Sequence, residues 1–150
     1  MLTNVVNAQT YQTRLRHVAP DKNVAFTIIQ PGDLGYGIGY GHFVSNRMGV
    51  YGTLSTGSYN AAQCRIKHHN RYSIGLLYYM PMNIDGSSFF NLYSGYSNHS
   101  YYGIKGHVTK AGLASNSFEI GVASGYDHFT GGIRLDVFKC ECSLDFGITF

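Results

Sequence analysis

The sequence predicts an all-β fold, and within that class an eight-stranded antiparallel up-and-down transmembrane β-barrel. Charged residues make up only 13% of the 150 residues, whereas Gly contributes 19 residues and Tyr 13. An average soluble domain carries about 25% charged residues, so this chain has too few charges to cover a surface exposed to water. Apolar residues also alternate with small or polar ones along most of the chain, which is the pattern of strands with two different faces.

Eight stretches carry this strand signal, separated by turn-forming residues. They are expected at about 23–30, 34–43, 48–58, 71–80, 88–97, 118–129, 132–138 and 143–150. Most are close to the roughly 9–11 residues that a tilted strand needs to cross a bilayer, and no apolar run reaches the roughly 18 residues of a transmembrane helix. A membrane-spanning form of this chain would therefore cross with strands.

The alternation is clearest in the second stretch and weakest in the third. In 34–42, Gly occupies every odd position, and Leu, Tyr, Ile, Tyr and His occupy the even ones. The stretch 71–80 has one fully apolar face and one mixed face. The stretch 48–58 alternates only weakly. The period of two, and the absence of a following helix signal, identify the Gly run as close strand packing rather than a nucleotide-binding loop.

The last three stretches separate their faces more sharply. Phe, Ile and Val alternate with Glu, Gly and Ala in 118–128, and Ile, Leu and Val alternate with Arg and Asp in 132–138. In 143–150, Leu, Phe, Ile and Phe alternate with Ser, Asp, Gly and Thr. Each of these stretches therefore presents one apolar face and one small or charged face.

After the first, the connections are expected to alternate in length. Segments 45–47, 81–86 and 130–131 are short, whereas 59–70 and 98–117 are long. Alternate connections of an up-and-down barrel lie at the same end, so the tight turns should lie with both termini and the long loops at the opposite end. The short segment 139–141 falls at the long-loop end and departs from this pattern.

The chain is expected to form one barrel domain over 23–150, preceded by a polar extension over 1–22. That extension lacks the apolar core of a secretory signal peptide.

The composition of the two faces distinguishes a membrane barrel from a soluble one. A soluble barrel would turn its apolar face inward and expose a face of Gly, Ser and Ala, which is poor in the charges that a soluble surface needs. A transmembrane barrel turns the apolar face to lipid and the small and polar face to the lumen, where small side chains suit the narrow interior of eight strands. We therefore expect a buried polar network in the lumen, made of Asn91, Glu119, Asp127, Arg134, Asp136 and Asp145.

The carboxyl-terminal strand resembles that of a known family. Leu144, Phe146, Ile148 and Phe150 alternate up to a terminal aromatic residue, which is similar to the last strand of small bacterial outer-membrane β-barrels of the OmpX/OmpA type. The resemblance implies an outer-membrane location and insertion by the barrel-assembly machinery, which reads the last strand. Members of that family carry an export signal, which is not seen at the start of this sequence.

The two expected long loops are basic. Their cationic and imidazole side chains are Arg65, Lys67, His68, His69, Arg71, Lys105, His107 and Lys110, and neither loop contains an acid. Such loops would attract the phosphates of lipopolysaccharide, or would be presented to a host surface or a partner protein. The leading functional hypothesis is therefore a structural or surface-interaction role, and the competing interpretation is a solvated polar surface.

A lipid A-modifying acyl hydrolase is the alternative from the enzyme class. Ser97 and His99 would share a strand face, with Glu119 as a third member, and nucleophilic catalysis requires these groups in hydrogen-bond contact. The order of Ser and His does not match the expected acyl-hydrolase pattern. A soluble barrel that binds an apolar ligand is the third alternative.

The three cysteines leave a disulfide open and do not indicate a metal site. Cys64 would pair with Cys140 or Cys142 if that end is extracellular. The same cysteines with His68 and His69 lack the usual spacing of zinc ligands. The sequence therefore predicts no metal and no cofactor, and the small net charge of +3 gives no support for nucleic-acid binding.

Overall fold

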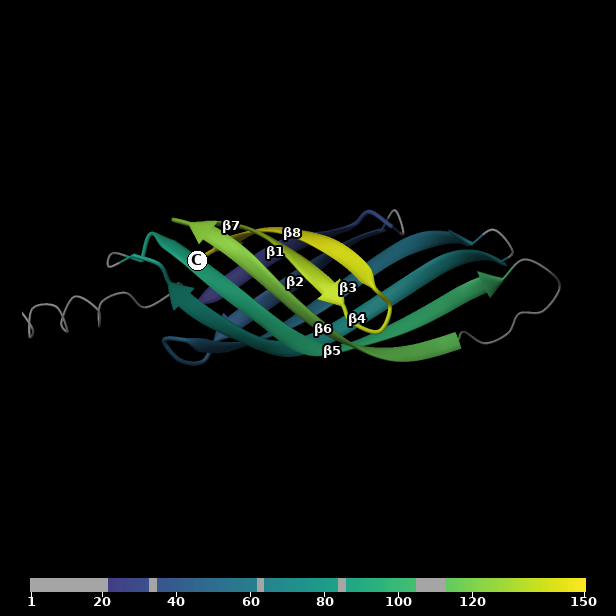
Figure 1. Ribbon diagram of the computed structural model, residues 1–150, viewed down its shortest axis with the longest axis horizontal. Helices are drawn as coiled ribbons and strands as arrows, with labels where there is room; N and C mark the ends of the chain where they lie inside the picture. The colour runs from purple at the N-terminus through teal and green to yellow at the C-terminus, as the bar shows by residue number, and fades with distance from the viewer. Residues whose placement is uncertain (1–21, 33–34, 62–63, 84–85, 105–112) are drawn as a thin grey trace, which may run out of the picture.

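The chain forms a closed barrel of eight antiparallel strands, each paired with its neighbour in sequence and β1 paired with β8 (Figure 1). The computed structural model describes residues 22–32, 35–61, 64–83, 86–104 and 113–150. The strands are β1 (Asn23–Gln30), β2 (Gly35–Phe43), β3 (Met48–Ala61), β4 (Cys64–Pro81), β5 (Ser88–Ile104), β6 (Leu113–Tyr126), β7 (Phe129–Asp136) and β8 (Glu141–Thr149). Among the described residues, no helix has the length and apolar character needed to span a membrane. The predicted eight-stranded up-and-down barrel is confirmed.

The two ends of the barrel differ, and we name them by their connections. The turn end holds the connections 44–47, 82–87 and 127–128 together with Asn23 and Phe150, which are joined by backbone hydrogen bonds of 2.9 and 3.0 Å. The loop end is the opposite one, where β3 meets β4, β5 meets β6 and β7 meets β8. Of the polar extension expected over 1–22, the structure describes only Lys22.

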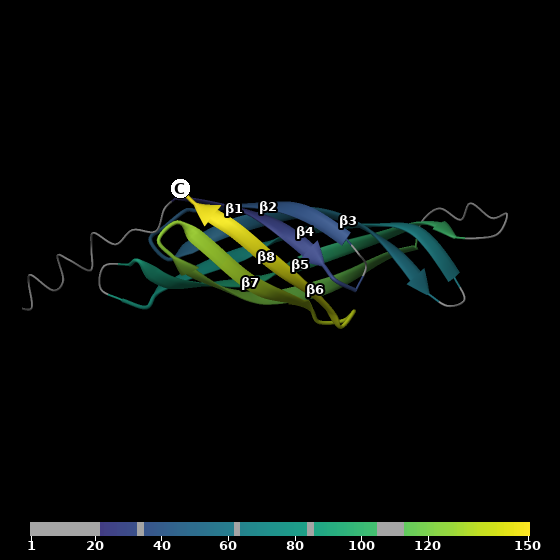
Figure 2. The same cartoon turned by 90° about the horizontal axis from the view of Figure 1, so that it is seen from above.

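Strands β3 to β6 are longer than predicted and run beyond the other four at the loop end (Figures 1 and 2). The expected loop over 59–70 is largely the paired ends of β3 and β4, and much of the expected loop over 98–117 belongs to β5 and β6. The backbone ladder needs no apolar side chain to continue. Where both faces are polar, the alternation that revealed the strands disappears although the pairing does not.

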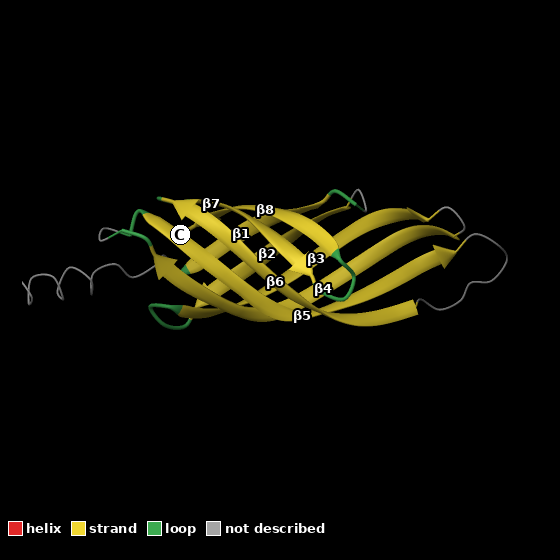
Figure 3. Cartoon of the chain, in the orientation of Figure 1, coloured by secondary structure: helices red, strands yellow, loops and turns green. Residues whose placement is uncertain are grey.

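The turn between β6 and β7 also differs from the expected position. It lies at Asp127–His128 rather than at 130–131, because Tyr126 and Phe129 are register partners. Asp127 has a φ of 54°, and Asp tolerates this left-handed conformation better than most residues with a side chain. Figure 3 distinguishes the strands (yellow) from the turns that join them (green).

The outer face of the barrel is apolar. Ile38 on β2 is 65% exposed, and Ile74 on β4 is 67% exposed. Other large apolar side chains that point outward include Leu54, Leu76, Tyr96, Ile120, Val122, Ile133, Leu135, Phe146 and Ile148. An apolar outer belt around a closed barrel is the arrangement of a transmembrane barrel, so the soluble alternative, which would expose the small and polar face to water, is wrong.

The turn-end half of the lumen is filled by aromatic and aliphatic side chains, which the sequence did not predict. Its buried residues are Val24, Phe26, Ile28, Phe43, Tyr51, Leu77, Tyr79, Phe89, Tyr93 and Ala123. Glycines at the paired positions of the neighbouring strands make the room for the rings, since Gly39 pairs with Phe26 and Gly125 with Phe89. A Cβ on Gly39 would overlap the Phe26 ring, and a Cβ on Gly125 would overlap the Phe89 ring. The Gly run of β2 is therefore the lumen-facing side of a packed interior.

Candidate functional site: the polar half of the lumen

Arg134 lies where the aromatic half of the lumen meets the polar half. Its Nε donates to Asp145 Oδ2 at 2.6 Å, and its Nη1 donates to Glu119 Oε1 at 3.3 Å. The guanidinium carbon also lies 4.4 Å from the ring centroids of Phe26 and Tyr93 and 4.8 Å from that of Tyr51. Arginine is suited to this position because one planar group can serve two carboxylates and stack on rings at once.

Glu119 accepts hydrogen bonds from groups on three other strands. Its Oε2 accepts from Arg71 Nη2 at 2.5 Å and from Ser73 Oγ at 2.9 Å. Its Oε1 accepts from Tyr51 Oη at 2.6 Å in addition to Arg134. Glu119 is 1% exposed, so these donors replace the water that a buried carboxylate requires.

Asp136 organises the next layer towards the loop end. Its Oδ2 lies 2.6 Å from His99 Nε2 and accepts from Ser97 Oγ at 2.9 Å. Its Oδ1 accepts a very short hydrogen bond from Ser117 Oγ. Arg71 Nη2 is 3.7 Å from Asp136 Oδ2, so this guanidinium connects the two carboxylate layers.

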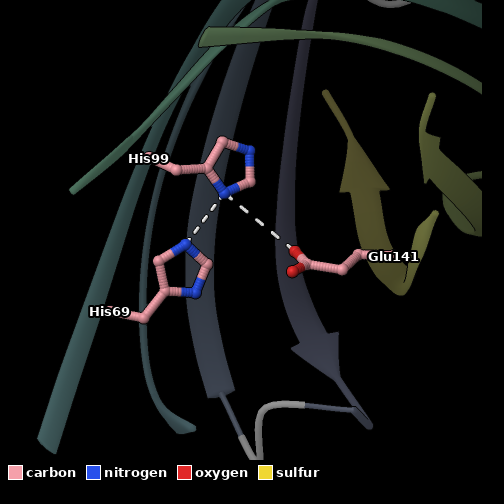
Figure 4. A group of neighbouring side chains, drawn as sticks. All are labelled: His69, His99 and Glu141. Carbon is pink, nitrogen blue, oxygen red and sulfur yellow. Dashed lines mark hydrogen bonds and ion pairs between the residues drawn. The ribbon is translucent and has the colours of Figure 1, made fainter. Parts of the chain in front are cut away.

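Next to Asp136, the rings of His69, His99 and Tyr101 are stacked. His69 Nε2 lies 2.8 Å from His99 Nδ1, and the His69 ring is stacked on Tyr101 with centroids 4.5 Å apart. Glu141 Oε2 lies 4.0 Å from the same His99 nitrogen (Figure 4). His69 and His99 are 1% and 0% exposed, whereas the Glu141 side chain is 28% exposed.

A cavity of about 370 Å³ opens beside this layer at the loop end. It is lined by Gln30, Pro31, Gly32, Arg71, Lys139, Cys140, Glu141 and Cys142. Arg71 belongs to the polar network and Glu141 to the histidine group. The cavity therefore connects the buried polar half of the lumen with the surroundings of the barrel.

Five of the six residues expected in the lumen network are buried. Glu119, Arg134, Asp136 and Asp145 form the hydrogen bonds described above, and Asn91 is buried among the aromatic residues nearer the turn end. Asp127 is different. Its side chain is 66% exposed beside His128, because β6 ends at Tyr126 and Asp127 lies in the turn that follows.

The set of residues expected on basic surface loops divides into three groups. Arg71 and His69 are not on a surface loop, because β4 continues through them and their inward position buries both. Arg65, Lys67 and His68 also belong to β4, but their side chains lie outside the described ones. Lys105, His107 and Lys110 lie outside the described residues altogether.

Two of the lumen residues that were missed lie near the expected start of the fourth strand at 71: His69 precedes that start, and Arg71 was counted with the preceding basic loop. His69, Arg71 and Ser73 continue the inward face of Gly75, Leu77 and Tyr79 at a period of two. The period of two, extended towards the amino terminus from Tyr79, would have placed His69 and Arg71 in the lumen.

The candidate catalytic residues do not form a catalytic triad. Ser97 Oγ lies 3.3 Å from His99 Nε2, but the carboxylate of Asp136 approaches the same imidazole nitrogen. A catalytic triad needs the nucleophile and the acid at opposite ring nitrogens. Glu119 instead binds Tyr51 and Arg71, so it is engaged elsewhere. Ser97 and His99 both have no exposed surface.

The carboxyl-terminal strand closes the barrel. Phe146, Ile148 and Phe150 are 53%, 48% and 55% exposed on the outer face, and Leu144 points to the same side. The strand pairs with both β7 and β1. Cys140 and Cys142 carry free thiols, so the structure forms no disulfide from them to Cys64, whose side chain lies outside the described ones.

Comparison with known proteins identifies the fold. No protein-family model matches the sequence, and no curated protein matches it significantly. Among solved structures, the N-terminal β-barrel domain of Pseudomonas aeruginosa OprF superimposes with a TM-score of 0.59 and 19% identity, over 87% of this chain and 99% of that domain. The chain has the fold of small outer-membrane β-barrels.

A second match is the Yersinia pestis outer membrane protein Ail in a phospholipid bilayer nanodisc. It superimposes with a TM-score of 0.48 and 11% identity, over 86% of this chain and 99% of that one.

Proposed function

We propose that this protein is an integral barrel of a bacterial outer membrane with a structural or surface-interaction role. The continuous apolar outer face around a closed, filled barrel is the observation that carries this proposal. An apolar belt of this kind is stable in lipid and unstable in water. The likeness of the fold to the OprF barrel domain supports the same environment.

The filled lumen favours an anchor over a wide pore. Aromatic rings block the turn-end half, and the network of Arg71, Glu119, Arg134 and Asp136 crosses the other half. Eight-stranded barrels have an interior just wide enough for side chains. We expect the refolded protein in a planar bilayer to show no stable channels of porin size, and regular large conductance steps would contradict this part of the proposal.

The loop end is the end proposed to face the outside of the cell. Outer-membrane barrels have short turns on the periplasmic side and longer connections outside. Both barrel termini lie at the end with the connections 44–47, 82–87 and 127–128, and β3 to β6 extend beyond the other four strands at the opposite end (Figure 1), although the β1–β2 and β7–β8 connections there are also short. That extension includes Arg65 and Lys67 in sequence, and Lys105 and Lys110 follow β5. We propose that these four cations bind the phosphates of lipopolysaccharide.

The last strand has a proposed role in assembly. Leu144, Phe146, Ile148 and Phe150 form an outward apolar row on the strand that closes the barrel. We propose that the barrel-assembly machinery recognises this row before β8 pairs with β1.

A charge-substitution experiment tests the lipopolysaccharide proposal. The refolded chain in detergent is titrated with lipopolysaccharide, and the variant R65Q/K67Q/K105Q/K110Q is compared with K22Q/R47Q, a control that removes two cations at the turn end. The account predicts that the first variant binds at least tenfold more weakly and that the second binds like the wild type. Equal binding by all three proteins would contradict the role of the loop-end cations while leaving the membrane barrel intact.

A further inference from the structure

Three possible metal ligands converge at the loop end of the lumen. They are His69 Nε2, His99 Nδ1 and Glu141 Oε2, which lie within 4.8 Å of one another. They come from three different strands, β4, β5 and β8, so the barrel rather than a local motif brings them together. Figure 4 shows the two imidazoles and the carboxylate directed at a common point.

Asp136 prepares His99 for metal coordination. Its carboxylate lies 2.6 Å from His99 Nε2, and a carboxylate accepts hydrogen bonds, so Nε2 carries the proton in the neutral ring. Nδ1 is then left with a lone pair that points at His69 and Glu141. When one nitrogen of a histidine binds a metal, the other usually donates its N–H to a carboxylate or a carbonyl, as His99 Nε2 does to Asp136.

The spacing of the ligand atoms is close to that of a tetrahedral zinc site. Zinc–nitrogen and zinc–oxygen bonds of about 2.0–2.2 Å imply ligand atoms roughly 3.3–3.5 Å apart. The His69–His99 pair is 2.8 Å apart and the His99–Glu141 pair 4.0 Å apart, so these two separations lie on either side of that value. All three ligand atoms lie within 4.8 Å of one another, so side-chain movements on the order of 1 Å convert the group to zinc geometry. Without metal, His69 Nε2–H donates to His99 Nδ1, and with metal His69 adopts the tautomer protonated on Nδ1.

The charges around the group favour a cation. The buried network contains the guanidiniums of Arg71 and Arg134 and the carboxylates of Glu119, Asp136 and Asp145. Two formal positive charges against three negative ones leave one negative charge before Glu141 is counted. Arg71 and Lys139 are the cations nearest the cavity, and Arg71 is already paired with Glu119.

The cavity supplies both a path and a coordination position. Glu141 lines it while the two histidines are buried behind, so an ion entering from the loop end meets the carboxylate first. Three protein ligands leave one position of a tetrahedral ion for water.

We propose that His69, His99 and Glu141 form a binding site for Zn²⁺ at the loop end of the lumen, with Asp136 positioning His99. The site draws ligands from β4, β5 and β8, so the bound ion clamps the projecting strands to the end of the last strand. Nothing in this proposal depends on lipopolysaccharide binding.

The test uses the full chain refolded in detergent and stripped with a chelator. Zn²⁺ is titrated in competition with a chromophoric chelator, and Co²⁺ is added separately as a spectroscopic probe of tetrahedral coordination. The expected result is one Zn²⁺ per chain, intense visible Co²⁺ bands, and no competition from millimolar Mg²⁺. The absence of Zn²⁺ binding would overturn the proposal.

Matched variants distinguish this site from adventitious binding by other groups. H69A, H99A and E141Q should each weaken Zn²⁺ binding by more than about tenfold, and D136N by roughly 10–100-fold. H42A and H128A, whose side chains lie on the outer face and in the turn at the opposite end, should bind like the wild type. A C64S/C140S/C142S variant should also retain the site. Loss of binding in that variant, or wild-type affinity in H69A, would overturn the proposal. Gel mobility before boiling verifies that each variant is folded.

Discussion

The two halves of the lumen are both filled by side chains, but the side chains differ in chemistry. The turn-end half contains rings such as Phe26 and Phe89, each packed over the glycine that pairs with it on the neighbouring strand. The loop-end half contains carboxylates such as Glu119 and Asp136, satisfied by arginine, serine, tyrosine and histidine side chains. The outer face shows no such division, since it is apolar along both.

This difference indicates how the halves contribute to stability and function. A ring packed against a glycine contributes through contact and volume, and a change there costs packing energy. A buried carboxylate contributes only while its partners remain, because an unpaired buried charge is expensive. The polar half is therefore the more sensitive one, and it is the one connected to the cavity at the loop end.

The largest effect is expected from removing the charge between the halves. R134L leaves Glu119 and Asp145 without their shared guanidinium, and breaking a buried pair in this way costs about 3–5 kcal/mol. Urea unfolding in lipid vesicles, followed by circular dichroism, measures the loss. R47L, at an exposed residue of the turn end, is the control and should unfold like the wild type. Equal stability of R134L and R47L would show that the polar half needs no central cation.

The second-largest loss of stability is expected from a charge on the outer face, which is apolar along both halves of the barrel. I133R places a guanidinium in the middle of β7 on the apolar belt, and a charge near the bilayer centre costs about 2–4 kcal/mol. S88R, at the turn-end start of β5, should cost at most about 1 kcal/mol because the position is near the membrane surface. The same urea titration compares them. A cost for S88R as large as for I133R would contradict the placement of the belt.

The third effect tests the packing of the turn-end half. G39V puts a branched side chain where the Phe26 ring lies, and overpacking of this kind costs about 1–3 kcal/mol. G131V is the matched change, because a Cβ at Gly131 meets nothing closer than 3.9 Å. Thermal or urea unfolding of the two variants should differ by that amount. If G39V is as stable as G131V, the aromatic half is not tightly packed.

The smallest effect examines one donor of the polar half. S73A removes the hydrogen bond to Glu119 Oε2 but leaves the bonds from Tyr51, Arg71 and Arg134, so the expected loss is about 1 kcal/mol. S124A changes an outward-facing serine on β6 and should have almost no effect. A loss for S73A as large as for R134L would mean that the network fails as a unit.

Much of the fold could be predicted from the sequence because the membrane imposes a simple rule. Apolar side chains must face lipid at every second position, so Ile74, Ile120 and Phe146 indicated their strands and faces. The number of strands, the antiparallel order and the end that holds both termini followed from that rule. The structure agrees with each of them.

The rule fails where the chain leaves the apolar belt. Along 64–71 of β4 both faces are largely polar, so His69 and Arg71 were assigned to a loop although they line the lumen. At the opposite end, Asp127 follows the inward alternation of β6 but lies in the turn. The pairing of His69 with His99 and Glu141 depends on the register of three strands, which periodicity alone does not determine.

The most direct test of the account is whether the barrel requires lipid or detergent to fold. The chain is refolded with and without detergent and run on SDS gels before and after boiling, with circular dichroism of each sample. We expect a compact, fast-moving band only in the detergent sample and a slower band after boiling. Cooperative folding in plain buffer, with no shift on boiling, would contradict the central claim that the apolar face of this barrel meets a membrane.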